Sequence, residues 1–121
     1  MIPNQSMNSI VTAIVPVAGK HKGILPRAIY SLQEQTYKPH ILIVDDSNNT
    51  LLPSDVIMGG IEVIGTGGGK GSAYSRNLGL DQVRTPLTFF MDADDYLLDT
   101  AIETMLRAYA SYDVCYIYSD W

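Results

Sequence analysis

Three carboxylates, those of Asp92, Asp94 and Asp95, directly follow an apolar run at residues 87–91. Burying such charges is costly unless something pairs with them. Acids spaced at i and i+2 beyond a strand can converge on Mg²⁺ or Mn²⁺, which prefer oxygen ligands and keep positions open for water or phosphate. The D-x-D spacing of Asp92 and Asp94 therefore predicts a metal site. The alternative is a strand end reaching water, where acid pairs are common.

A second acid pair, Asp45 and Asp46, ends the apolar run at residues 41–44. At the edge of a doubly wound sheet, such a carboxylate often accepts a hydrogen bond from a nucleotide. Asp45 and Ser47 could instead cap a turn. Arg76 falls early in a predicted helix, where it could meet an anion together with the helix N-terminus, or simply be solvated.

The loop "GTGGGKGS" at residues 65–72 suggests phosphate binding but matches neither named motif. In the Walker A register the first position is Ile64, and Gly71 stands where Ser or Thr must follow. The two G-x-G-x-x-G registers end on Lys70 and Ser72 instead of glycine. His21 and His40 have no partner at metal or catalytic spacing, and both are assigned to the surface.

The remaining pattern is an alternation of strands and helices. Runs rich in Val and Ile predict buried strands, which cover residues 11–15, 41–44, 61–64, 87–91 and 114–118. Helical spacing predicts helices with apolar faces, formed by Leu25, Ala28, Ile29 and Leu32 in one and by Ile102, Met105, Leu106 and Tyr109 in another. A further helix is predicted over residues 73–82.

Helix starts are also signalled locally. Pro26 suits a first turn, and Thr100 with Glu103 matches the capping-box pattern. Ser72 is the expected cap of the helix over residues 73–82.

This alternation predicts an α/β fold, a mostly parallel sheet of about five strands with helices on both faces and right-handed crossovers. Ligands of such sheets bind beyond the carboxyl ends of the strands. The residues at those ends are Pro16 to Lys20, Asp45 and Asp46, the glycine loop, and Asp92 to Asp95. The opposite ends carry Lys38, Pro39, His40, Arg84, Thr85 and Pro86 instead. A ligand site is therefore expected at the first edge.

The composition restricts the partners. A chain of 121 residues fits one domain, here residues 10–121 after an N-terminal extension at 1–9. A net charge of -5 argues against holding nucleic acid or an anionic membrane by Lys and Arg alone. No apolar run is long enough for a membrane span, residues 1–9 do not resemble a signal peptide, and a lone Cys115 suits a reducing compartment. A cytoplasmic location is expected.

Several segments occur in an order that is itself informative: "AIVPV" (13–17), "AIYSLQEQTY" (28–37), "ILIVDDS" (41–47), "SRNLGL" (75–80) and "FFMDADD" (89–95). Together they resemble the nucleotide-binding half of a family 2 glycosyltransferase of the GT-A fold. The resemblance covers nearly everything from Ile10 onward.

The resemblance implies a nucleotide-sugar donor, commonly a UDP-sugar, and an acceptor that is a glycan, lipid or protein. It implies that Asp46 lies near the base, Arg76 near the nucleotide or its diphosphate, and Asp92 near the ribose. The whole nucleotide-binding set would be Pro16, Val17, Ala18, Asp45, Asp46, Arg76, Asp92 and Ala93. Asp94, with Asp92 as a possible second ligand, would hold Mn²⁺ or Mg²⁺. In this family an acceptor hydroxyl, deprotonated by a carboxylate, displaces the nucleoside diphosphate with inversion.

The sequence departs from the family in places. Ala18 and Gly19 stand where the family usually has an aromatic residue and then Asn, so a stacking contact to the base is expected to be missing. After the two acids the family usually has Gly-Ser or Ser-Thr, and the Ser47, Asn48 and Asn49 found here are a milder change. The chain stops after its predicted fifth strand, whereas the family's acceptor site and catalytic base lie further along. The base is therefore expected outside this chain, and Asp120 receives no role.

Truncation would leave apolar surface uncovered, with Tyr116, Tyr118 and Trp121 as candidates for an exposed patch, so a homo-oligomer is expected. Other functions stay open. The chain could bind donor without transferring sugar. A haloacid-dehalogenase-like phosphatase also uses D-x-D, but near its first strand. A receiver-like module carries its acid pair after the first strand, not the second.

Overall fold

The computed structural model describes residues 8–21, 23–47 and 61–112. The elements in chain order are β1 (Val11–Val17), the short 3-10 helix η2 (Gly19–His21), α1 (Leu25–Gln33), β2 (His40–Asp45), β3 (Glu62–Gly65), α2 (Ser72–Gln82), β4 (Leu87–Phe90) and α3 (Ala101–Ser111). Every strand and helix predicted within this range is present. The predicted strand at 114–118 and the aromatic patch of Tyr116, Tyr118 and Trp121 lie outside the described residues.

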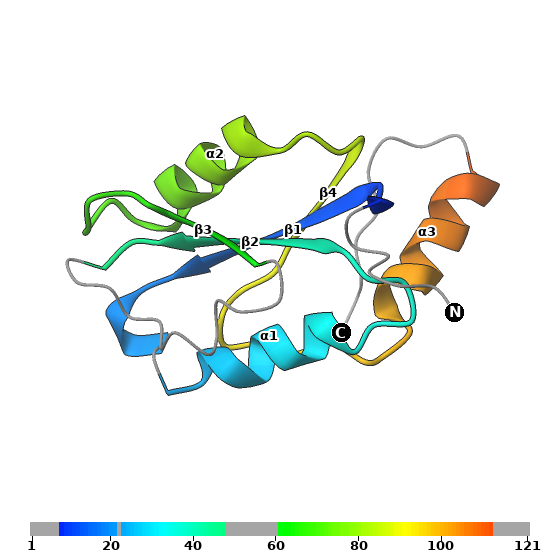
Figure 1. The fold of residues 1–121 in the computed structure, drawn as a ribbon, viewed down its shortest axis with the longest axis horizontal. Coiled ribbons are helices and arrows are strands. Elements are labelled where there is room, and N and C mark those ends of the chain that lie inside the picture. Colours follow the sequence, from blue (N-terminus) through cyan, green and yellow to red (C-terminus); the bar gives the residue numbers. More distant parts are fainter. Residues whose placement is uncertain (1–7, 22, 48–60, 113–121) are drawn as a thin grey trace.

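The strands form a parallel sheet in the order β3-β2-β1-β4 (Figure 1). Val17 lies opposite Asp45, and Asp45 lies opposite Gly65, so these three strands end at the same level. Because all the pairings are parallel, the carboxyl ends of the strands meet at one edge. The predicted α/β class is confirmed, with four strands in the described part of the chain.

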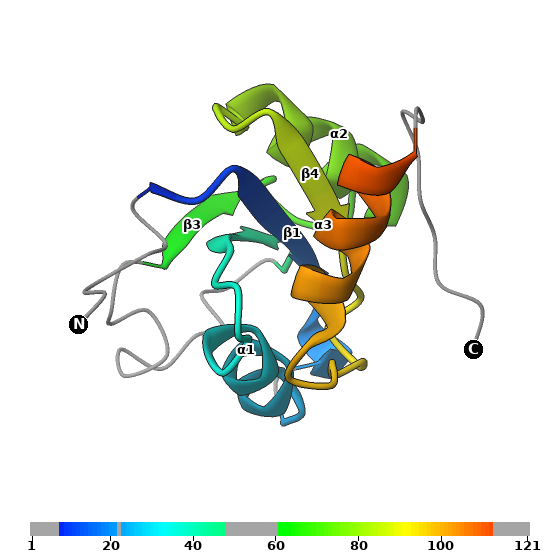
Figure 2. The same cartoon turned by 90° about the vertical axis from the view of Figure 1, so that its right-hand side faces the viewer.

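The core is built on both faces of the central strand β1, all of whose residues are buried. One face packs against α1 and the start of α3, through Val15, Leu32 and Ile102 among others. On the other face of the sheet, Ile14 of β1 and Val44 of β2 lie against Gly79 of α2. Figure 2 shows α1 and α2 on opposite sides of the sheet. The predicted apolar face of α1 is confirmed, since Leu25, Ala28, Ile29 and Leu32 are all buried.

The prediction of buried strands is wrong for β3 and β4. Val63 is 37% exposed and Phe90 is 46% exposed, because within the described residues these strands border the sheet and have a neighbour on one side only. The predicted face of α3 is buried only at its start. Ile102 is buried, whereas Tyr109 is 39% exposed.

The helix starts agree only in part with the sequence signals. Pro26 lies in the first turn of α1, as predicted. Thr100 precedes α3 but its side chain makes no capping hydrogen bond; instead the Ile102 amide donates to Gln35 Oε1 at 3.0 Å. The cap of α2 is Gly71, not Ser72, because the chain turns there with a φ of 92°, which favours glycine.

Gly79 allows α2 to lie close to the sheet. A Cβ atom there would lie 2.9 Å from Ile14 Cγ2 and 3.0 Å from Val44 Cγ2. We expect Gly79→Ala to lower the free energy of unfolding by about 1 kcal/mol, because overpacking outweighs the gain in helix propensity. Urea denaturation measures this change. The loss should shrink in a Val44→Ala background, which removes one of the crowding methyl groups, and an undiminished loss would contradict the explanation.

Candidate functional site

Main-chain hydrogen bonds join the strand ends at the carboxyl edge of the sheet. The Asp46 amide donates to Val17 O at 2.8 Å, linking the ends of β1 and β2. The Gly69 amide donates to Asp46 O at 2.9 Å, which brings in the loop after β3. The groups predicted to share this edge therefore do so, and the acids after β4 complete it.

The acids after β4 form a cluster. One carboxylate oxygen from each of Asp92, Asp94 and Asp95 lies within 4.8 Å of the others, and all three residues are exposed. Desolvation, together with the charges of Asp94 and Asp92, raises the pKa of Asp95 above its usual value. The sequence predicts Asp94 with Asp92 as the ligand set, and the structure places the Asp95 carboxylate beside them. Three converging carboxylates are a donor set suited to a hard divalent cation.

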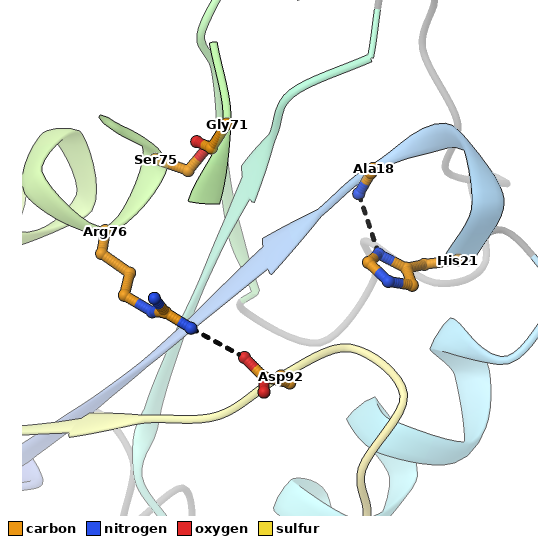
Figure 3. A network of polar contacts seen from close by, with 6 residues as sticks. All are labelled: Ala18, His21, Gly71, Ser75, Arg76 and Asp92. Carbon is orange, nitrogen blue, oxygen red and sulfur yellow. Dashed lines mark hydrogen bonds and ion pairs between the residues drawn. The ribbon is translucent and has the colours of Figure 1, made fainter. Parts of the chain in front are cut away.

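Arg76 reaches this cluster from α2. Its Nη2 atom lies 3.0 Å from Asp92 Oδ1 (Figure 3). Both side chains are partly exposed, so the ion pair adds little to stability. It matters for the site because it places a guanidinium beside the carboxylates. The two residues border a depression of about 320 Å³, lined also by Phe89, Phe90, Met91, Asp95 and Leu97.

Asp46 is engaged by the glycine loop. Its Oδ1 atom accepts from the Thr66 hydroxyl at 2.5 Å and from the Lys70 amide at 2.8 Å, and its Oδ2 atom accepts from the Gly71 amide at 2.9 Å. Desolvation alone would raise the pKa of Asp46, but these hydrogen bonds outweigh it and hold the pKa below its usual value. The glycine loop was expected to bind phosphate, but in this structure its Lys70 and Gly71 amides bind the carboxylate of Asp46.

Asp45 caps a turn with Ser47, which was the alternative to a ligand contact. Its Oδ1 atom accepts from the amide and the hydroxyl of Ser47, at 2.9 and 2.7 Å. This is the local turn cap that short acids favour.

The remaining expected nucleotide residues lie at the end of β1 and in the acid segment. Pro16, Val17 and Ala93 are buried, and only Ala18 is partly exposed. Val17 and Ala93 pack in the core, so any contact of theirs with a ligand must come mainly from the main chain.

Two residues that the sequence did not reveal as part of the site also contribute to the carboxyl edge of the sheet. His21 Nδ1 accepts from the Ala18 amide at 3.0 Å and orders the turn after β1 (Figure 3). Arg27 on α1 donates to Asp94 O at 3.1 Å, and its guanidinium carbon lies 4.8 Å from the centre of the Tyr96 ring. Spacing could not reveal Arg27, because its partners lie 67 and 69 positions away in the chain.

His40, also assigned to the surface from its sequence, pairs with Glu62 at 3.2 Å. It lies at the start of β2, away from the carboxyl edge. Among the helices of the described residues, none is long and apolar enough to cross a membrane.

The fold agrees with that of solved structures. TarS from S. aureus superposes with a TM-score of 0.72 at 20% identity, over 84% of this chain and 19% of that one. A structure of TarS residues 1-349 superposes with a TM-score of 0.68 at 23% identity, over 83% of this chain and 31% of that one. The chain therefore spans less than a third of either neighbour.

Comparison with curated proteins gives no significant match. The model of glycosyl transferase family 2 matches residues 12–119. Because this match spans most of the sequence, the chain belongs to glycosyl transferase family 2.

Proposed function

We propose that the chain binds a nucleoside-diphosphate sugar, with UDP as the first candidate nucleotide, as the donor-binding part of an inverting glycosyltransferase. The observation that carries the proposal is the 3.0 Å pair between Arg76 and Asp92 beside the acid cluster. It sets an anion-binding group next to a cation-binding one, which is what a metal diphosphate needs. Membership of the family supports a sugar nucleotide over other diphosphates.

The nucleotide would lie along the strand ends. Asp92 can turn from Arg76 to the ribose or to a metal, which frees the Arg76 guanidinium for a phosphate oxygen. The main chain of Pro16, Val17 and Ala18 would border the nucleoside. Asp45 and Asp46 lie at the same edge and shape it through the turns that they hold. Ala93 is buried within the acid segment, where its main chain would border the nucleotide.

The acid cluster fits Mg²⁺ or Mn²⁺, since it offers only oxygen ligands and is open to solvent. Asp94, with Asp92, would hold the ion, and Asp95 lies within reach. When bound, such an ion neutralises the charge that develops on the departing diphosphate. Arg27 on α1 contacts the acid segment as well, because it donates to Asp94 O.

Transfer itself needs an acceptor and a base. The acceptor would be a glycan, a lipid or a protein, and its hydroxyl would attack after a carboxylate takes its proton. No residue described here is assigned as that base. Donor binding and transfer are therefore tested separately.

Calorimetric titration with UDP, GDP and dTDP, each with and without Mn²⁺, tests donor binding. We expect one nucleotide to bind, and to bind much more tightly when Mn²⁺ is present, because the ion offsets the repulsion between acids and diphosphate. Equal affinity with and without Mn²⁺, or no binding at all, would contradict the proposal. If binding is found but sugar transfer and donor hydrolysis are both absent, the chain is a donor-binding fragment.

A further inference from the structure

The segment that carries the acid cluster runs alongside α1 before it enters α3 (Figure 1). The far end of this segment is held by the turn after α1, because Gln35 Nε2 donates to Leu98 O at 2.6 Å. The acid end is held by α1 itself, where Arg27 Nη2 donates to Asp94 O at 3.1 Å. Arg27 therefore links α1 to the part of the segment where the carboxylates lie.

The three acids belong to one tight turn. The Asp95 amide donates to Asp92 O at 3.1 Å, so the chain folds back on itself at residues 92–95. Arg27 binds the carbonyl of Asp94, the third residue of this turn, and its guanidinium carbon lies 4.8 Å from the centre of the Tyr96 ring just beyond it. A polar contact and a ring contact thus attach the turn to α1.

The contacts of Arg27 differ in kind from those of the second arginine near the cluster. Arg76 Nη2 lies 3.0 Å from Asp92 Oδ1, an atom that a cation would need as a ligand. The two contacts of Arg27 are with a carbonyl and a ring, and neither occupies a carboxylate oxygen. Arg76 therefore competes with a cation for Asp92, whereas these contacts of Arg27 do not.

The charge of Arg27, taken alone, disfavours a cation in the cluster. Desolvation and the charges of Asp94 and Asp92 raise the pKa of Asp95, and the charge of Arg27 opposes them, so the guanidinium is close enough to act on the carboxylates. Arg27 and the three acids are all exposed, however, and water and salt weaken such a repulsion. Ordering the turn and repelling a cation predict opposite results of removing Arg27.

We infer that Arg27 is a positioning residue for the divalent cation, which attaches the turn at residues 92–95 to α1 so that its carboxylates converge. This deepens the proposed function and rests on its metal site. Groups that orient metal ligands without touching the metal typically change metal affinity by about 10- to 100-fold. An effect of that size exceeds the screened repulsion between exposed charges, so the ordering of the turn should decide the result.

The experiment titrates Mn²⁺ alone into the wild type and into Arg27→Met, Arg76→Met and Arg84→Met, each of which removes one positive charge. In Arg27→Met we expect the affinity for Mn²⁺ to fall about tenfold. In Arg76→Met it should rise about threefold, because Asp92 loses its ion pair. Arg84 is exposed and precedes β4, at the opposite edge of the sheet. Its replacement should leave the affinity within about twofold of the wild type.

Two further variants separate the ordering of the turn from charge. Arg27→Lys keeps the charge and one donor, so it should bind Mn²⁺ more tightly than Arg27→Met, whereas repulsion alone gives the reverse order. Tyr96→Leu removes the ring and leaves every charge in place, and it should lower the affinity by less than Arg27→Met does. Hydrogen exchange at the Asp95 amide reports the turn without any ligand, and it should quicken in Arg27→Met but not in Arg84→Met.

An affinity in Arg27→Met equal to or above that of the wild type overturns the inference, because the guanidinium would then only repel the cation. Unchanged exchange at the Asp95 amide overturns it as well. Should Arg27→Met fail to fold, Tyr96→Leu answers the same question, and wild-type affinity in that variant counts against the inference. A wild type that binds no Mn²⁺ refutes the metal site of the proposed function instead.

Discussion

Replacing Asp94 by alanine should abolish the dependence of nucleotide binding on Mn²⁺. One carboxylate oxygen from each of Asp92, Asp94 and Asp95 lies within 4.8 Å of the others. Desolvation, and after it the charges of Asp94 and Asp92, raises the pKa of Asp95. Removing one carboxylate takes away a charged ligand worth up to about 3 kcal/mol. We expect the affinity for Mn²⁺ to fall about 100-fold, and the diphosphate to lose its bridge to the protein.

Titration of Mn²⁺ alone, followed by titration of the nucleotide, measures the two effects separately. The matched control is Asp81→Ala, which makes the same change of charge at an exposed position on α2. Because it lies outside the acid cluster, it should leave both affinities within about twofold of the wild type, an energy of about 0.4 kcal/mol. Similar losses in the two variants would mean that net charge, not coordination, governs binding.

Replacing Gln35 by leucine should be the most destabilising of the substitutions considered. Gln35 is 1% exposed and joins three segments. Its Nε2 atom donates to Ser31 O at 3.0 Å and to Leu98 O at 2.6 Å, while Oε1 accepts from the Ile102 amide at 3.0 Å. Leucine has a similar size but leaves the amide of Ile102 buried without its partner, at the start of α3. Since each such orphaned group costs about 1–3 kcal/mol, we expect a loss of about 3 kcal/mol.

Chemical denaturation gives the free energy of unfolding for this comparison. Gln33→Leu is the control, because Gln33 is the last residue of α1, two positions before Gln35, and its side chain is exposed; it should change stability by less than about 0.5 kcal/mol. Hydrogen exchange at Ile102 should quicken in Gln35→Leu and not in the control. If the two variants unfold at the same denaturant concentration, the side chain of Gln35 does not hold the start of α3.

Much of the edge could be predicted from the sequence, because the end of an apolar run marks where a strand ends. Asp46 and the acids from Asp92 onward follow such runs, and parallel pairing brings their strand ends together. The burial of the individual strands was predicted less well. Composition cannot distinguish a central strand from one with a neighbour on one side only, and so Val63 and Phe90 are more exposed than expected.

The sequence by itself determined the alternation of strands and helices, the family, and the acids at the carboxyl edge, because these rest on periodicity and on residues close along the chain. Only the tertiary structure decided which groups meet. Asp46 finds its donors in a loop 20 or more positions away, and Gln35, not the local capping box, holds the start of α3. Hydrogen bonds form between whatever donors and acceptors the packed chain brings within about 3 Å, and no local pattern encodes that proximity.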